Sequence, residues 1–264
     1  MQIDLSSKVA IVSGSAGGIG FAIAKGLAES GATVVLNGPT QDLVDSGLSR
    51  MAALLPNSKI RGVAADLGTP EGVSKLVAAE PSADILINNL GIFGANDFFD
   101  ISDSEWHKFL DVNVMSGVRL SRAYLPGMAE RNWGRVIFIS SESAINIPTD
   151  MIHYGVTKTA LLGLSRGLAK RMAGTAVTVN AILPGPTLSE GFVNLLQEEV
   201  RKTGRSIDDV ARDFIKANRP TSVLQRPASV EEVANLVVYV ASDLSSATTG
   251  SALRVDGGVV EGIN

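Results

Sequence analysis

The chain has 264 residues, of which 45% are hydrophobic and 19% are charged, as in a globular rather than a disordered protein. It contains no cysteine and only two histidines, which excludes disulfides and thiolate chemistry and predicts no metal site. The formal net charge of −4 gives no electrostatic reason to expect nucleic acid or an anionic membrane surface as a partner. The N-terminal region lacks a secretory-signal pattern, and the longest uncharged stretch is interrupted by glycine and proline. We therefore expect a cytoplasmic protein without a membrane segment.

Short apolar runs alternate with longer helical patterns along the whole chain. The runs expected to form strands are Val9–Val12, Thr33–Leu36, Ile60–Ala64, Ile85–Ile87, Val136–Ile139, Val177–Ile182 and Ala252–Val255. The main segments expected to be helical are Ile19–Glu29, Asp42–Leu55, Glu71–Ala79, Asp103–Glu130, Ile152–Met172 and Glu231–Ala241. Continuously apolar strands that alternate with helices are typical of a parallel sheet covered on both faces. The sequence therefore predicts one α/β domain over residues 1–264, a Rossmann-type doubly wound parallel sheet of about seven strands.

One interval, residues 186–227, breaks this alternation. It has no strand signal and holds two short helical stretches, Phe192–Lys202 and Asp208–Asn218. An excursion of this kind between two strands is often a lid or a binding element, so we expect it to cover a substrate. Its apolar side chains either form a wall over the substrate or pack the two helices together. These side chains are Phe192, Leu195, Leu196 and Phe214.

A glycine-rich turn follows the first predicted strand. Gly14, Gly18 and Gly20 allow a tight turn and a close approach of the backbone to a pyrophosphate at the start of the next helix. The spacing differs from both the G-x-G-x-x-G fingerprint and the P-loop. An ordinary glycine-rich turn is the alternative, but the position after the first strand favours dinucleotide binding.

The choice between NAD and NADP is expected to be made about 20 residues further on, at the end of the second strand. That position holds Asn37, where an Asp or Glu would favour NAD and a nearby Arg would favour NADP. The side chains of Asn37 and Thr40 are able to hydrogen-bond either ribose. We therefore expect NADP or NAD as the cofactor.

Tyr154 and Lys158 are four residues apart in a helical segment and share one face of it. A nearby ammonium group lowers the pKa of a phenol toward the working range of a general acid or base. Such a pair also occurs by chance on helix surfaces. Ser141 follows the strand Val136–Ile139, and the carboxyl ends of strands are where ligands bind in an open α/β sheet. The neighbouring His153 falls on another helix face and is expected to be solvated.

Taken in order, these motifs resemble those of the short-chain dehydrogenase/reductase family over essentially the whole chain, with 3-oxoacyl-carrier-protein reductases among the most similar members. The resemblance rests on Gly14, Gly18, Gly20, Asp66, Asn88, Asn89, Gly91, Asn113, Ser141, Tyr154, Lys158, Asn180, Pro184, Gly185 and Val255-Asp256-Gly257-Gly258. It implies an NAD(P)-dependent oxidoreductase that transfers a hydride between nicotinamide and a small carbonyl compound or secondary alcohol.

The resemblance also implies a role for each matching residue. Tyr154 exchanges a proton with the substrate oxygen, and Lys158 binds the nicotinamide ribose and lowers the pKa of the tyrosine. Ser141 hydrogen-bonds the substrate oxygen, Asn113 holds a water of a proton relay, and Asp66 contacts the adenine. The expected cofactor contacts are Gly14, Ser15, Gly18, Ile19, Gly20, Asn37, Asp66, Leu67, Asn89, Gly91, Tyr154, Lys158, Pro184, Gly185 and Thr187.

Three departures from the family pattern affect the expected cofactor or its surroundings. Pro39 stands where NADP-dependent relatives with an Asn-Gly-Arg sequence have the arginine, and residues 15–17 hold no basic side chain. Leu90 replaces the usual alanine of the Asn-Asn-Ala-Gly motif and is expected to repack locally. Because Asn37 presents no carboxylate to repel a 2′-phosphate, NADP remains the favoured cofactor.

Two other functions are compatible with the fold. A catalytically silent nucleotide-sensing protein is the first alternative, and the intact set of Asn113, Ser141, Tyr154 and Lys158 argues against it. A nucleotide-sugar epimerase is the second, but such chains are usually longer and space their glycines differently.

The helices expected at Asp103–Glu130 and Ile152–Met172 carry apolar residues on more than one face, which predicts subunit contacts. In the first helix we expect Trp106, Leu110, Val114 and Val118 to cover the sheet. Met115, Leu120 and Tyr124 are expected to lie partly outside that stripe. The last strand would form an open sheet edge. Together with the family resemblance, these features predict a homotetramer, or failing that a dimer.

Overall fold

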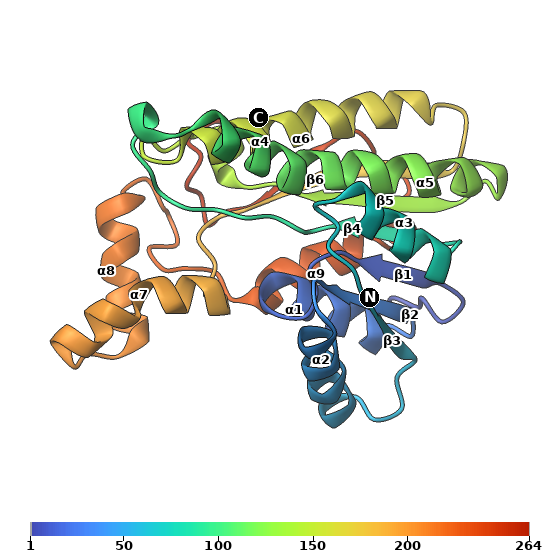
Figure 1. Ribbon diagram of the computed structural model, residues 1–264, viewed down its shortest axis with the longest axis horizontal. Coiled ribbons are helices and arrows are strands. Elements are labelled where there is room, and N and C mark those ends of the chain that lie inside the picture. Colours follow the sequence, from blue (N-terminus) through green and yellow to red (C-terminus); the bar gives the residue numbers. More distant parts are fainter. Residues whose placement is uncertain (1, 264) are drawn as a thin grey trace.

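The computed structural model describes residues 2–263 and contains one sheet of seven strands in the order β3-β2-β1-β4-β5-β6-β7. Every neighbouring pair of strands is parallel. Figure 1 labels the strands β1 to β6. The strands are β1 (Val9–Val12), β2 (Thr33–Gly38), β3 (Ile60–Ala64), β4 (Ile85–Asn88), β5 (Gly134–Ile139), β6 (Val177–Pro184) and β7 (Ala252–Val255). The predicted Rossmann-type sheet is therefore confirmed, with several strands one or two residues longer than their apolar runs.

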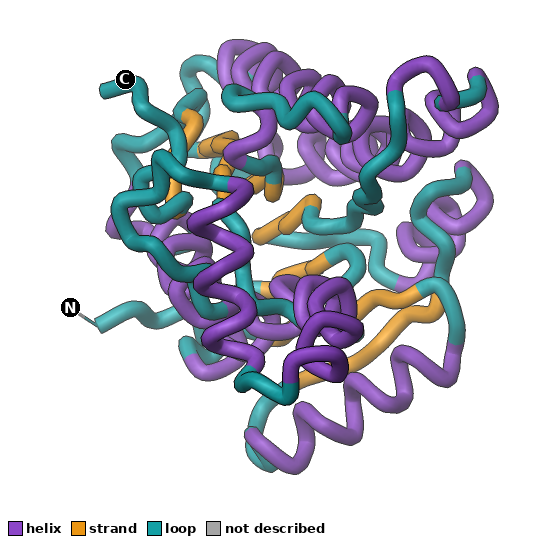
Figure 2. The backbone as a smooth tube through the Cα atoms, turned by 90° about the vertical axis from the view of Figure 1, so that its left-hand side faces the viewer, coloured by secondary structure: helices purple, strands orange, loops and turns teal. Residues whose placement is uncertain are grey.

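Helices cover both faces of this sheet. The α-helices of the chain are α1 (Gly18–Glu29), α2 (Gln41–Leu54), α3 (Pro70–Ala79), α4 (Asp103–Leu110), α5 (Ser116–Glu130), α6 (Ile152–Arg171), α7 (Glu190–Thr203), α8 (Ile207–Asn218) and α9 (Val230–Val240). Side chains of α1, α2 and α9 pack on one face, and those of α3, α5 and α6 pack on the other. Figure 2 shows the strands enclosed between the helices. Because both faces are covered, every residue of β5 and β6 is buried.

The helix expected over Asp103–Glu130 is interrupted. Residues Asp111–Met115 form a π-helical turn between α4 and α5, and this turn contains Asn113. The Asn113 side chain is 2% exposed and bonds to the backbone of Ile92, accepting from its N–H at 2.7 Å and donating to its carbonyl at 3.0 Å. A π turn inserts one extra residue into a helix and is often found at functional sites. Here it accommodates an asparagine that faces inward, which the apolar periodicity alone does not reveal.

The predicted faces of α4 and α5 are reversed. Leu120 and Tyr124 are buried against the sheet, and the Tyr124 hydroxyl donates to the Glu80 carbonyl at 2.8 Å. The side chains expected to cover the sheet are only half-buried. These are Trp106, Leu110, Val114 and Val118. In α4, Trp106 and Phe109 pack against His153 of α6. The π turn then changes the angular spacing before α5, so a regular stripe does not continue into that helix.

The segment 186–227, which we call the lid, contains α7 and α8 and stands to one side of the sheet (Figure 1, orange). Ser189 and Ser206 cap the two helices through side-chain oxygens that accept from backbone N–H groups. The helices share a small apolar core of their own, formed by Phe192, Leu196, Val210 and Ala211. The lid therefore has a core of its own, and it connects β6 at its start to α9 at its end.

No helix within residues 2–263 combines the length and the apolar character needed to cross a membrane.

Candidate active site

Four strands bring the site residues together. β1, β4, β5 and β6 are neighbours in the sheet, and Ile139 of β5 pairs in register with Ile182 of β6. The loops that follow these strands therefore open at one sheet edge, next to the point where the chain order reverses between β1 and β4. That edge is where open α/β sheets bind ligands.

The glycine turn after β1 fits tightly against its neighbours. Gly14 and Gly18 have φ angles of 59° and 56°, a left-handed conformation that favours glycine. A Cβ atom at Gly20 would lie 2.5 Å from Nδ2 of Asn89, so this position also excludes a larger residue. α1 begins without a side-chain cap at Gly17, which leaves backbone N–H groups at its start without a side-chain partner. Such a helix start is suited to bind a pyrophosphate.

Polar side chains fasten this turn to β4. The Ser13 hydroxyl accepts from the backbone N–H groups of Asn89 and Leu90, each at 2.9 Å. Nδ2 of Asn89 donates to the carbonyls of Ser13 and Gly14 at 2.9 and 3.0 Å. The Ser15 hydroxyl similarly donates to the Val12 carbonyl at 2.7 Å. These bonds hold the turn in one conformation. Leu90, which stands where the family motif has alanine, packs against Gly14.

Asn37 does not face the ribose site as the sequence suggested. Its side chain is only 1% exposed, and Oδ1 accepts from the Gly14 N–H at 3.0 Å. Nδ2 donates to the carbonyls of Val63 and Ala65 at 3.1 and 3.0 Å. The hydrogen bonds of this side-chain amide therefore join the glycine turn to β2 and β3. The two residues directly after β2, Pro39 and Thr40, are exposed instead.

The turn after β3 places two further expected cofactor contacts. Asp66 is exposed, and its Oδ1 accepts from the Gly68 N–H at 3.0 Å. Leu67 is 1% exposed and belongs to the apolar core, so only its backbone is available to a ligand.

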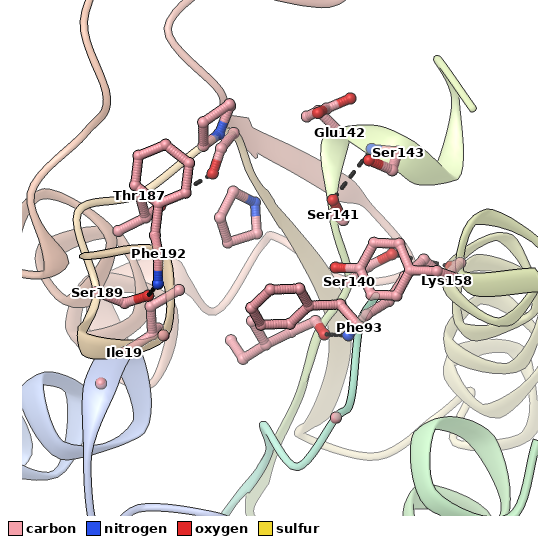
Figure 3. Close-up of a pocket in the computed structure, with 18 of the residues that line it drawn as sticks. Ile19, Phe93, Ser140, Ser141, Glu142, Ser143, Lys158, Thr187, Ser189 and Phe192 are labelled. Carbon is pink, nitrogen blue, oxygen red and sulfur yellow. Dashed lines mark hydrogen bonds between the residues drawn. The ribbon is translucent and has the colours of Figure 1, made fainter. Parts of the chain in front are cut away.

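A cavity of about 370 Å³ lies at the carboxyl edge of the sheet. The expected site residues that line it are Gly18, Ile19, Gly20, Asn89, Gly91, Ser141, Tyr154, Lys158, Pro184, Gly185 and Thr187. Figure 3 shows Ser141 and Lys158 on one side of this cavity and Thr187 on the other. The remaining expected residues lie around it rather than along it. These are Gly14, Ser15, Asn37, Asp66, Leu67 and Asn113.

Tyr154 and Lys158 of α6 lie next to each other at the cavity wall, with Nζ of Lys158 5.5 Å from the centroid of the tyrosine ring. Burial raises the pKa of Tyr154 to about 12, while a hydrogen bond with Ser141 opposes the increase. Burial lowers the pKa of Lys158 to about 8. Nζ of Lys158 donates to the Ile139 carbonyl at 2.9 Å, which fixes the ammonium group beneath the site.

Asn113 is linked to this pair through a neighbouring residue of α6. Its Nδ2 donates to Oγ1 of Thr157, a residue of α6 adjacent to Lys158, at 3.0 Å. A Cβ atom at Gly91 would lie 3.2 Å from Nζ of Lys158 and 3.5 Å from Oδ1 of Asn113. Gly91 therefore keeps open the space between the lysine and the asparagine.

The loop after β6 closes the opposite side of the cavity. At Gly185 a Cβ atom would lie 2.6 Å from the carbonyl oxygen of Asp256, so only glycine lets the two segments approach. The Thr187 hydroxyl donates to the Gly185 carbonyl at 2.9 Å. Asn180 of β6 is fully buried and bonds to residues 248 and 251, which fastens β6 to the segment before β7.

The lid supplies apolar and charged groups to the cavity. Phe192 both lines the cavity and packs within the lid, while Leu195 and Phe214 line the cavity and Leu196 belongs to the lid core. Both interpretations of these side chains therefore hold.

Several lining residues were not predicted from the sequence. Arg219 at the end of α8 donates from Nε to Oε1 of Glu142 at 2.8 Å, and Phe93 packs edge-on against Tyr154. Arg219 and Glu142 are 77 positions apart, and no local pattern links them.

The environment of His153 was predicted wrongly. It was expected to be solvated, but it is fully buried, with its ring centroid 4.1 Å from that of Phe109.

The residues present fit a dinucleotide. Glycine positions 17, 18, 20 and 91 line the cavity without side chains, which leaves a path along the turn toward Lys158. NADP or NAD would lie there with its pyrophosphate at the start of α1, and Lys158 would donate to its ribose hydroxyls. When bound, the cofactor supplies or accepts the hydride.

Comparisons with known proteins agree with this geometry. A family model described as enoyl-(acyl carrier protein) reductase matches residues 14–260. The uncharacterized oxidoreductase YvaG of Bacillus subtilis strain 168 is 46% identical over 263 residues, which cover 100% of both chains. The 3-oxoacyl-(acyl-carrier-protein) reductase FabG of Aquifex aeolicus is 32% identical over 98% of this chain and 100% of its own length.

Among solved structures, L-sorbose reductase from Gluconobacter frateurii in complex with NADPH and L-sorbose has a TM-score of 0.92. It is 31% identical, and the match covers 100% of both chains. The protein therefore belongs to the short-chain dehydrogenase/reductase family. It is an oxidoreductase that transfers a hydride between NADP or NAD and a carbonyl or alcohol substrate, as its sequence predicted.

Proposed function

We propose that the protein reduces a small carbonyl compound, with Tyr154 as the general acid. The observation that carries this proposal is the meeting of Tyr154, Lys158 and Ser141 at one cavity wall. With a pKa of about 12, Tyr154 is a neutral phenol at pH 7 and has a proton to donate to the substrate oxygen.

Lys158 supports the proton transfer through its charge. Its pKa of about 8 leaves it mainly protonated at pH 7, so it stabilises the phenolate that Tyr154 becomes after giving up its proton. Ser141 is positioned to donate to the developing oxyanion of the substrate, which would hold it for transfer. Asn113 would act as a positioning residue, through Thr157 on α6 and through the space that Gly91 leaves beside Lys158.

The alternative of a silent nucleotide-binding protein has no specific support here. Such a protein has no need of a buried lysine beside a tyrosine at the end of the cofactor path. The two functions are separated by following NADPH and NADH oxidation at 340 nm with a panel of ketoses, keto acids and 3-oxoacyl thioesters. Turnover of any carbonyl compound that is lost in Ser141→Ala supports the enzyme, whereas tight nucleotide binding with no turnover across the panel favours the alternative.

The proposal includes NADP as the favoured cofactor and the cytosol as the compartment. Neither of the two exposed residues directly after β2, Pro39 and Thr40, carries a carboxylate that would repel a 2′-phosphate, and this supports NADP. The cytosol is consistent with a reaction that consumes reduced nicotinamide nucleotides.

We further propose that the functional unit is a homotetramer. Supporting features are the half-buried apolar stripe on α4 and α5, and the outer side of α6, where a Cβ atom at Gly163 or Gly167 would meet nothing within 4 Å. Within residues 2–263, β7 pairs only with β6, so its other edge is open to a second copy.

Light scattering is expected to give about four times the chain mass of 27.5 kDa. A Gly163→Arg variant should lower that mass, whereas Gly94→Arg on an open loop should not, and a wild-type monomer would contradict the assembly.

A further inference from the structure

Arg50 reaches the glycine turn from a distant part of the chain. It lies near the end of α2, and its guanidinium donates from Nη2 to the carbonyl oxygen of Ala16. The guanidinium also stacks on the ring of Phe21, with Cζ 4.4 Å from the ring centroid. These contacts fix a positive charge beside the cofactor turn. The Arg50 side chain is nevertheless 41% exposed, so one side of it is open to a ligand.

A carboxylate already lies against this arginine. Oε1 of Glu190, the first residue of α7, is 2.7 Å from Nη1 of Arg50. A Cβ atom at Gly17 would lie 2.6 Å from Oε2 of Glu190 and 3.9 Å from Nη2 of Arg50. The two charged groups therefore fill the space over Gly17, where a larger residue would carry its side chain. The pair is well exposed, and exposed ion pairs contribute little to stability, so an incoming anion could replace Glu190.

The exposed positions around this turn hold no other cation. Residues 13–20 and 37–41 contain neither lysine nor arginine, and the Asn37 amide is committed to backbone groups. A phosphate on the ribose at the end of β2 would therefore find Arg50 as its charged partner. A guanidinium presents paired N–H donors that match the geometry of a phosphate.

We propose that Arg50 binds the 2′-phosphate of NADPH, and that Glu190 occupies the place of this phosphate when it is absent. The inference rests on the proposed preference for NADP, and it assigns that preference to a residue of α2 instead of to the turn itself. Because Glu190 begins α7, binding of the phosphate also releases the outer ion pair that joins the lid to the body of the protein. NADH, which lacks the phosphate, leaves that pair in place.

Isothermal titration with 2′,5′-ADP and with 5′-AMP tests this assignment without requiring turnover. Arg50→Gln is expected to weaken the binding of 2′,5′-ADP by about 10-fold or more and to leave 5′-AMP within about two-fold. Glu190→Gln removes the competing carboxylate. It is expected to tighten the binding of 2′,5′-ADP and to leave the binding of 5′-AMP unchanged. Arg50→Lys should retain part of the effect, because lysine keeps the charge but loses the paired donors.

Lys25→Gln serves as the matched control, since it removes one positive charge from an exposed ion pair with Glu29 on α1. It is expected to change the affinity for neither ligand. The assignment is overturned if Arg50→Gln weakens the binding of both ligands equally, which would mean a structural role. It is also overturned if this variant weakens the binding of neither ligand. Selective loss of 2′,5′-ADP binding supports the assignment even if no carbonyl compound is reduced. Failure of this assignment and failure of the proposed reaction are therefore distinguishable.

Discussion

Arg219 and Glu142 form an ion pair that joins the lid to the residue directly after Ser141. Nε of Arg219 lies 2.8 Å from Oε1 of Glu142, and the two side chains are 17% and 3% exposed. Burial raises the pKa of Glu142, and the contact with Arg219 opposes that increase by favouring the carboxylate. The end of α8 is thus held over the cavity by a nearly buried charge pair.

Removing the arginine from this pair should loosen the lid. In Arg219→Met the Glu142 carboxylate is left buried without its partner, which is expected to cost about 3–5 kcal/mol of stability or to open α8 locally. Hydrogen exchange of the α8 amides and urea unfolding measure the two outcomes. Arg212→Met, which breaks an exposed pair with Asp209, is the matched control and should change stability by less than about 1 kcal/mol. Equal effects of the two variants would contradict this role for Arg219.

Pro39→Arg should tighten NADPH. Residue 39 is exposed at the end of β2, so an arginine there is free to add a charge-assisted contact to the 2′-phosphate. We expect the Kd of NADPH to fall by about 10-fold and that of NADH to change little, as measured by nucleotide fluorescence. A gain of the same size for both nucleotides would show that the contact is not to the phosphate. A wild-type protein that binds NADH far more tightly than NADPH would contradict the preference itself.

Asn37→Asp should destabilise the protein. A carboxylate retains the bond from the Gly14 N–H but faces the carbonyls of Val63 and Ala65 without a donor. We expect a loss of about 3 kcal/mol or more in the free energy of unfolding. Thr40→Asp is the informative comparison, because residue 40 is exposed at the start of α2. It should keep full stability and shift the preference toward NADH, whereas a fully stable Asn37→Asp protein would contradict the buried role of the amide.

The buried ammonium of Lys158 predicts a pH-dependent stability. The pKa of Lys158 falls from an ordinary value of 10.5 to about 8, so the folded protein gives up a proton between these values that the unfolded chain retains. The charge therefore costs stability below pH 8, and the cost disappears as the pH rises to 10.5. Lys158→Met is expected to be more stable than the wild type at pH 7 by up to about 3 kcal/mol.

Urea unfolding of both proteins from pH 7 to pH 10 checks this expectation. The advantage of Lys158→Met should shrink steadily above pH 8, because the free energy of unfolding of the wild type rises with pH there. A constant difference between the two proteins across this range would mean that the folded lysine titrates at its ordinary pKa.

The sequence was sufficient for the sheet and for those lining residues that belong to local motifs, because both depend on local patterns. The apolar runs give the strands, and motifs such as Tyr154 with Lys158 follow at strand or helix positions that the fold brings to one edge. What could not be predicted depends on distant contacts. The inward turn of Asn37 requires the position of β3, and the pairs of Arg50 and Arg219 connect segments far apart in the chain. The faces of α4 and α5 were wrong because a π turn interrupts their period.

Tyr154→Phe tests the central claim most directly, since it removes the phenolic proton while keeping the ring against Phe93. With a carbonyl substrate and saturating NADPH, kcat is expected to fall by about 10²–10⁴-fold, while the Kd of NADPH stays within about two-fold of wild type. Stopped-flow measurement of NADPH oxidation, with the Kd obtained by fluorescence titration, gives both quantities on the same protein. Loss of turnover with intact nucleotide binding is the predicted result. Turnover at the wild-type rate would contradict the assignment of Tyr154 as the general acid.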